Sequence, residues 1–354
     1  MLTMLEERKE TFLYPAEKRI PGKFQIQNRR FLGNKFKLLN FIGDIILEEC
    51  GSVTSICDIF AGTGVVGHGF NAQNMKVISN DILFSNYVSL KTFLGSCNLD
   101  IILLEKHISF LNGLTPSRDN YFSKNFGNKY FTSENAKKIG LIRQTIETMD
   151  LNVEMKAALI TSLIYAVDKV ANTVGHYDAF RKNIDMVRPL KLLLPEINQD
   201  SNRNNEIYHE DANLLIKHIE CDVLYIDPPY NSRQYCDAYH LLENLAVWEK
   251  PPVFGIASKM DRDHLKSKYC LKSAAEFFSK LISEAKCKHI LVSYNNTGES
   301  KDCRSNSRIN DSEIVKIMRN KGKVKVYERD YKPFTTGKSI SDSHTERVFY
   351  CKVK

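Results

Sequence analysis

Four consecutive residues combine groups that can hold a flat heterocycle with an exocyclic amine: Asp227, Pro228, Pro229 and Tyr230. The Asp227 carboxylate and a backbone carbonyl of the rigid proline turn can each accept a hydrogen bond from the amine. The Tyr230 ring offers a surface on which the heterocycle can stack. The structural alternative is an ordinary turn at a strand end, because Asp-Pro commonly starts turns.

A short apolar segment must position these residues. Residues 223–226 are apolar and lie between Cys221-Asp222 and the two prolines, which is typical of a strand buried on both faces of a parallel sheet. The prolines end the strand because neither can donate a ladder hydrogen bond. Asp227 is therefore predicted at the carboxyl end of a central strand, where open α/β sheets bind ligands.

A second candidate site is a glycine-rich turn upstream. Residues 53–60 are predicted as a strand that runs into this turn, and a helix follows it. The glycines let a ligand approach the backbone at a helix N-terminus, which favours negative groups. The turn contains a G-x-G-x-x-G pattern in the setting that such a motif requires, formed by Gly62, Gly64 and Gly67.

An acidic residue completes this second site. The next predicted strand, 76–80, ends at Asp81, and a carboxylate there can hold both ribose hydroxyls of an adenosyl group. The turn is not a Walker A loop, because no Gly-Lys-Ser/Thr follows it. On these residues alone, a nicotinamide, a flavin or another adenosyl ligand fits equally well, and a purely structural turn is the alternative.

The strand and helix alternation is interrupted in the middle of the chain. A helix is expected over 34–50 and another over 82–96. Residues 100–200 read as aromatic-rich loops with two helices, near 133–149 and 153–173, and a polar tract at 198–205 resembles a linker. The alternation then resumes, and residues 323–330 and 346–353 are expected to close the sheet as an antiparallel pair. The chain is therefore predicted to be an α/β protein with a helical insertion.

Composition and charge narrow the class of protein. The chain has 354 residues, a formal charge of +8 and a sequence pI near 8.8, which favours a polyanionic partner. Nine cysteines show no disulfide or metal-ligand spacing, so we expect a reducing, cytoplasmic location and no metal. No membrane span is expected, because the most apolar long stretch, 155–173, carries three charged residues.

Two segments are candidate phosphate contacts. Seven basic residues and no acidic ones lie between Lys18 and Lys37, among them Arg29 and Arg30, although a solvated arm is the equal alternative. A loop at 175–182 mixes aromatic and cationic residues, including Tyr177 and Arg181, although it could equally be a turn between helices. Asn231 and Arg233, directly after the proline turn, complete the candidate set.

In combination these motifs resemble the α-group DNA adenine-N6 methyltransferases of restriction–modification systems, which use S-adenosylmethionine. The D-x-F-x-G-x-G motif of that family is met by Asp58, Phe60, Gly62 and Gly64, and its aromatic-x-G-x-K motif by Phe31, Gly33 and Lys35. The family also places its Asp-Pro-Pro-Tyr motif after the target-recognition region, as here. Outside 100–200 and the first 25 residues, the resemblance covers nearly the whole chain.

The resemblance implies a fold and a domain order. The fold is a Rossmann-like class I methyltransferase, with a mostly parallel seven-stranded sheet and a terminal antiparallel hairpin. Residues 1–30 would form a basic arm, 31–99 and 206–354 the catalytic domain, and 100–205 an inserted target-recognition subdomain.

The resemblance also implies the roles of individual residues. Asp227, Pro228, Pro229 and Tyr230 would hold a target adenine flipped from duplex DNA. S-adenosylmethionine would contact Phe31, Lys35, Asp58, Phe60, Ala61, Gly62, Thr63, Gly64, Asp81, Ile82, Asp211 and Ala212. DNA would contact Arg29, Arg30, Tyr177, Arg181, Asn231 and Arg233.

The implied activity is site-specific methylation of adenine N6, which would protect DNA from a cognate restriction endonuclease. Two alternatives stay open. RNA adenine-N6 and DNA cytosine-N4 methyltransferases hold their target amine in the same kind of pocket. A non-catalytic adenosyl-nucleotide-binding module would keep the glycine turn without needing Asp227.

Overall fold

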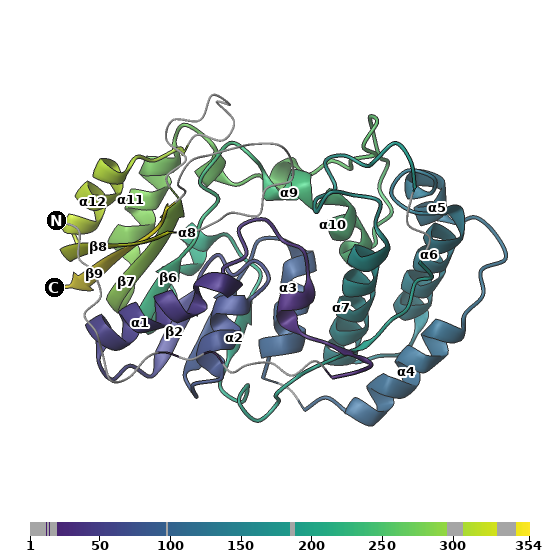
Figure 1. Ribbon diagram of the computed structural model, residues 1–354, viewed down its shortest axis with the longest axis horizontal. Helices are drawn as coiled ribbons and strands as arrows, with labels where there is room; N and C mark the ends of the chain where they lie inside the picture. Colours follow the sequence, from purple (N-terminus) through teal and green to yellow (C-terminus); the bar gives the residue numbers. More distant parts are fainter. Residues whose placement is uncertain are drawn as a thin grey trace.

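The computed structural model describes residues 20–96, 98–184, 188–295, 307–330 and 345–354, together with Phe12 and Tyr14. The rest of the predicted arm before residue 20, Cys97, Cys303 and the predicted glycine- and serine-rich loop at 331–344 lie outside these residues. A sheet with helices on both faces forms one end of the molecule, and a group of helices forms the other (Figure 1).

Seven strands form the main sheet, in the order β5-β3-β2-β6-β7-β9-β8. The first five are parallel to one another, and β9 runs antiparallel to both β7 and β8. The predicted parallel sheet with a terminal antiparallel hairpin is thus confirmed. The strands are β2 (Ser55–Asp58), β3 (Lys76–Asn80), β5 (Glu206–Tyr208), β6 (Glu220–Ile226), β7 (Lys286–Asn295), β8 (Gly322–Asp330) and β9 (Thr345–Val353).

The predicted central strand is buried on both faces because its apolar residues alternate between two hydrophobic cores. In β6, Val223 and Tyr225 pack into the larger core, and Leu224 and Ile226 into the smaller one. The larger core is covered by α1 (Leu39–Cys50), α2 (Val65–Asn71), α3 (Phe84–Leu94) and α10 (His240–Val247). The smaller core is covered by α8 (Ala212–Leu215), α11 (Ala274–Glu284) and α12 (Asp311–Arg319).

The described residues between 100 and 200 form four helices, two more than predicted. They are α4 (Ile101–Gly113), α5 (Tyr121–Phe126), α6 (Ser133–Thr148) and α7 (Val153–Val170). The aromatic residues expected in loops lie partly in α5, whose N-terminus is capped by Asn120 and Ser123. These helices join the same hydrophobic core as α3 and α10, so the middle segment packs directly onto the sheet domain.

Short elements connect these layers. A two-stranded parallel sheet pairs β1 (Lys23–Phe24) with β4 (Leu194–Pro195). The remaining helical turns are η1 (Ile26–Asn28), η2 (Phe36–Leu38), α9 (Tyr235–Ala238), η3 (Asp263–Leu265) and η4 (Lys268–Cys270). The predicted helix over 34–50 is thus divided between η2 and α1. Within the described ranges, no helix has the length and apolar character needed to cross a membrane.

Candidate active site

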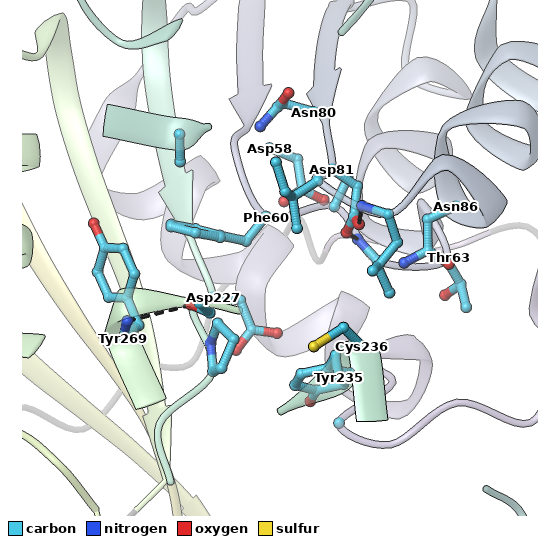
Figure 2. A pocket seen from close by; sticks show the side chains of 18 of the residues that line it. Asp58, Phe60, Thr63, Asn80, Asp81, Asn86, Asp227, Tyr235, Cys236 and Tyr269 are labelled. Carbon is cyan, nitrogen blue, oxygen red and sulfur yellow. Dashed lines mark hydrogen bonds between the residues drawn. The ribbon is translucent and has the colours of Figure 1, made fainter. Parts of the chain in front are cut away.

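A cavity lies at the carboxyl ends of β2, β3 and β6, where the strand order reverses between β2 and β6. This position is the one at which open α/β sheets bind ligands. Figure 2 shows Asp58, Asp81 and Asp227 around the cavity, with Phe60 and Tyr269 on one side and Tyr235 and Cys236 on another. Of the predicted cofactor residues, all except Gly64 line it.

The glycine turn supports one wall of the cavity. Gly62 and Gly64 have φ angles of +55° and +83°, a region in which glycine avoids the steric cost of a side chain. Gly64 faces inward, because a Cβ there would lie 2.5 Å from Leu90 Cδ2. Gly64 therefore shapes the turn from behind and does not face a ligand.

Asp81 fastens the turn to the next helix. Its two carboxylate oxygens accept hydrogen bonds from the Gly62 amide at 2.9 Å and the Leu83 amide at 2.8 Å. Burial raises the pKa of Asp81 to about 6, although these hydrogen bonds oppose the rise. Since a carboxylate oxygen has more than one lone pair, Asp81 can still accept from a ligand hydroxyl.

Asp58 ends β2 and has an unused acceptor. Its side chain is 2% exposed, and its buried Oδ1 has no hydrogen-bond partner among the described residues. Burial raises the pKa of Asp58 well above its ordinary value, and the nearby charges of Asp227 and Asp81 raise it further. A donor from a ligand would satisfy this oxygen.

Lys35 joins two carboxylates that come from different strands. Its Nζ lies 3.2 Å from Asp227 Oδ1 and 2.8 Å from Glu346 Oε1 on β9, and all three side chains are mostly buried. Burial alone would lower the pKa of Lys35, but the two carboxylates outweigh it and raise the pKa well above its ordinary value. Lys35 is therefore a fixed positive charge beside Asp227.

Asp227 has the properties of an acceptor that titrates near neutrality. Burial raises its pKa to about 6; the Lys35 ammonium opposes this rise, and the charge of Glu346 adds to it. At pH 7 to 8 most Asp227 side chains are thus ionised and can accept hydrogen bonds.

The other residues of the proline turn differ in position: one lines the cavity and two do not. Pro229 lines the cavity, whereas Pro228 and Tyr230 are not among its lining residues. The Tyr230 carbonyl accepts hydrogen bonds from the Arg308 amide at 2.8 Å and the Tyr294 hydroxyl at 3.3 Å. The Tyr230 ring lies edge-on to that of Tyr294, with centroids 5.8 Å apart.

An aromatic stack with two tyrosines that were not predicted supports another wall, which Phe31 and Tyr235 line. The Phe31 ring stacks on Tyr239 and Tyr235, with centroid separations of 4.6 and 5.3 Å. Phe31 was predicted from its motif. Tyr235 and Tyr239 follow the proline turn at helical spacing, and that spacing was the one signal that could have indicated them.

A loop between α10 and α11 also reaches the cavity. Residues 264–269 contribute to its lining, and the Tyr269 ring meets Phe60 edge-on at 5.0 Å. The Tyr269 hydroxyl donates to Asn213 Oδ1 at 2.9 Å. No local sequence pattern indicates this approach, because it depends on the path of the chain between α10 and α11.

Asp211 lies at the rim and acts mainly as a helix cap. Its side chain accepts hydrogen bonds from the amides of Asn213 and Leu214 at the start of α8. Asp211 and Ala212 both line the cavity, as does the unpredicted Asn86. The buried Nδ2 of Asn86 has no hydrogen-bond partner among the described residues and offers a second unused polar atom.

Two predicted DNA contacts are buried and need correction. Arg29 is 3% exposed, donates to Asn86 Oδ1 at 2.8 Å and lies 3.5 Å from Asp168 Oδ2. Tyr177 is 2% exposed, and its hydroxyl donates to Asp168 at 2.6 Å. A buried side chain with internal partners cannot reach a phosphate, so neither residue belongs to a DNA-binding surface.

The other four predicted contacts lie nearer the solvent. Arg30, Arg181 and Arg233 are exposed, and Asn231 is half-buried with its side chain accepting from the Arg233 amide at 2.9 Å. Across the described ranges, no group of three His, Cys, Asp or Glu side chains has the arrangement of a metal site. The cysteines within those ranges are free thiols.

Comparisons with known proteins match nearly the whole chain. Residues 31–297 match the family model of the D12 class N6 adenine-specific DNA methyltransferases. The type II methyltransferase M.NlaIII of Neisseria lactamica is 34% identical over 331 residues, which cover 89% of this chain and 95% of that protein.

Two further relatives differ in length. The type II methyltransferase M.FokI of Planomicrobium okeanokoites is 33% identical over 348 residues, covering 91% of this chain but 52% of that protein, so the match spans about half of M.FokI. The type II methyltransferase M.CviAII of Paramecium bursaria Chlorella virus 1 is 27% identical over 329 residues, covering 90% of this chain and 97% of that protein.

Proposed function

This chain belongs to the D12 class of N6 adenine-specific DNA methyltransferases and methylates adenine in DNA at specific sites, and we propose that its methyl donor is S-adenosylmethionine. The donor would supply an electrophilic methyl group on a sulfonium centre. The observation that carries the proposal is the convergence of three carboxylates, Asp58, Asp81 and Asp227, on one cavity. Glu210 and Asp211 also line the cavity, so five carboxylates face three lysines, Lys35, Lys266 and Lys268, and the balance favours a cationic ligand.

The residues present fit such a donor. Asp58 Oδ1 and Asn86 Nδ2 are buried polar atoms without partners among the described residues, and a ligand with both donors and acceptors would satisfy them. Asp81 would accept from the ribose hydroxyls. Phe60 and the backbone of the glycine turn, with Ala61, Gly62 and Thr63, would contact the flat and extended parts of the donor.

We propose that Asp227 holds the target adenine. Its carboxylate and the Pro228 carbonyl would accept the two N6–H bonds, which favours a more localised lone pair on a nitrogen whose electrons are otherwise shared with the ring. Lys35 fixes Asp227 in place, and Tyr230 would stack against the flipped base. These are positioning and electrostatic roles, so Asp227 need not take a proton before transfer.

The surrounding surface would bind the duplex. We propose Arg30, Arg181, Asn231 and Arg233 as contacts to the DNA backbone, and residues 100–205 as the segment that reads the target sequence. The relatives are named as type II methyltransferases. We propose that this chain likewise protects DNA from a cognate endonuclease, in the cytoplasm.

Equilibrium binding followed by methyl transfer tests the proposal. The full chain should bind S-adenosylmethionine and transfer tritium from its labelled methyl group to duplex DNA but not to RNA of the same sequence. Binding without transfer to any nucleic acid would support a non-catalytic module, and transfer to RNA alone would contradict the proposed substrate.

A further inference from the structure

The loop after α10 ends in an apolar tip that projects from the protein. Phe254 is 66% exposed and Ile256 85% exposed. Gly255 stands between them with a φ of +70°, and a Cβ there would meet nothing within 4 Å. Large apolar side chains presented together at a narrow tip indicate a contact with another molecule.

The tip is held rigidly. Phe254 and Lys259 exchange two backbone hydrogen bonds, of 2.8 and 3.0 Å, and these bonds close a four-residue loop. Just behind the tip, the Ala257 carbonyl accepts from the Tyr130 hydroxyl, and Ser258 is 3% exposed and donates to the Asn125 carbonyl. Phe254 and Ile256 are therefore exposed on a fixed support, and a partner that meets them need not order the loop first.

The base of this loop touches the wall of the active-site cavity. Lys259 Nζ lies 3.4 Å from Asp237 Oδ1, and Arg262 pairs with the same carboxylate. Asp237 belongs to α9, whose Tyr235 and Cys236 line the cavity. Ile256 is three residues from Lys259, so the Cα atoms of these two residues lie no more than about 10 Å apart. In Figure 1 the green loop after α10 rises at the same edge of the molecule as α9.

Cations outnumber carboxylates around the base of the loop, where Lys259 and Arg262 are paired with Asp178 and Asp237. Arg233 and Lys259 both lie near His176. Burial is the largest cause that lowers the pKa of His176, and the positive charges of Arg233 and Lys259 lower it further. Lys129 donates to Ser258 Oγ at 2.9 Å, and Arg181 and Lys182 are exposed on the neighbouring loop. An apolar tip above a cationic base complements a polyanion whose interior is a stack of apolar bases.

We propose that Phe254 and Ile256 form a wedge that enters the base stack of the substrate DNA beside the flipped adenine. Proteins that open or kink a duplex insert side chains of this kind between bases. This role rests on the proposed function, because the opening arises only if Asp227 receives a flipped base. The wedge would stabilise the opened duplex and leave the cofactor site unaffected.

The test compares flipping and methylation on a known site. The recognised sequence is first read by modified-base sequencing of plasmid DNA from cells that produce the full chain. A duplex with 2-aminopurine at the target then reports flipping, and the unmodified duplex reports single-turnover methylation. We expect Phe254→Ala/Ile256→Ala to lower both by roughly 10-fold, the scale of lost stacking on one base, with unchanged S-adenosylmethionine affinity.

The chain provides a matched control. Leu47→Ala removes an apolar side chain that is 41% exposed on α1, a helix far from this loop and outside the proposed DNA-binding segments (Figure 1). This variant should behave as wild type. On a duplex with a mismatched target, whose opening costs less, the deficit of the tip variant should shrink.

Each result decides the proposal. Wild-type rates in the tip variant, or an equal deficit on the paired and mismatched duplexes, would overturn the wedge while leaving the proposed function intact. A wild-type chain that methylates no DNA would overturn the proposed function and the wedge with it.

Discussion

Lys35 stands between two carboxylates that the sequence separates widely, and the fold brings all three together. Asp227 and Lys35 were each predicted from a local motif, Asp227 as the acceptor beside the target and Lys35 as a cofactor residue. Glu346 was not predicted, because it lies in an ordinary alternating strand and nothing near it in the sequence indicates a partner. Its position follows from the antiparallel insertion of β9 beside β7, which places it near the end of β6.

Glu346 should set the pH at which Asp227 ionises. Besides burial, the groups that shift the pKa of Asp227 are Lys35 and Glu346. Asp58, Tyr225 and Tyr235 also face Asp227, whose charge raises their pKa values. Protonation of Asp227 removes its negative charge and turns one acceptor oxygen into a donor, so single-turnover methylation should fall as the pH drops through about 6. Glu346→Gln removes a negative charge that raises the pKa of Asp227. The fall in methylation rate on the acidic side of the pH profile (its acidic limb) should therefore occur at lower pH.

The pH profile of single-turnover methylation is the measurement. Glu328→Gln, on the neighbouring strand β8 and exposed, is the matched control and should leave the limb in place. A limb that stays at the wild-type pH in Glu346→Gln, or moves upward, would show that Glu346 does not act on Asp227.

At the scale of elements, periodic and motif-bearing segments were predicted well, and helices of uneven pattern were not. The strand before Asp227 and the strand, glycine turn and helix around Gly62 follow directly from burial and turn chemistry. Helix α4 was missed because Ile102, Leu103 and Phe110 are exposed, so its apolar residues do not mark one face. Helix α5 was missed because it has six residues and ends before a glycine.

The glycine turn should not tolerate a side chain at Gly64. Gly64→Ala places a Cβ in the left-handed region, at a cost of about 1–2 kcal/mol. It also places that Cβ 2.5 Å from Leu90 Cδ2, and crowding of this kind adds about 1–3 kcal/mol. Urea unfolding should therefore show a loss of about 2–5 kcal/mol.

Gly22→Ala separates strain from crowding. Gly22 has a φ of +80°, and a Cβ there would meet nothing within 4 Å. The loss should be only about 1–2 kcal/mol. Equal losses in the two variants would mean that Leu90 moves aside freely and that Gly64 is needed only for its backbone angle.

At the scale of the whole molecule, the mostly parallel seven-stranded sheet and its antiparallel end agree with the sequence-based prediction. The predicted boundary residues, 100 and 206, lie next to the start of α4 and at the start of β5. The way the insertion packs was not predictable, because it depends on contacts distant in sequence, such as Thr92 with Thr161 at 2.9 Å. That residues 264–269 line the cavity was not predictable either, because it also depends on contacts between residues distant in sequence.

We propose that Asp227 holds the adenine that this enzyme methylates. Modified-base sequencing of DNA from cells that produce either the wild-type chain or Asp227→Ala tests it most directly, with S-adenosylmethionine binding measured on both proteins. Lys35 keeps its contact with Glu346 in the variant, so folding and cofactor binding should persist. We predict N6-methyladenine at one recurring sequence with the wild type, and a loss of at least about 100-fold in methylation rate with Asp227→Ala. Equal methylation by the two proteins would contradict the account.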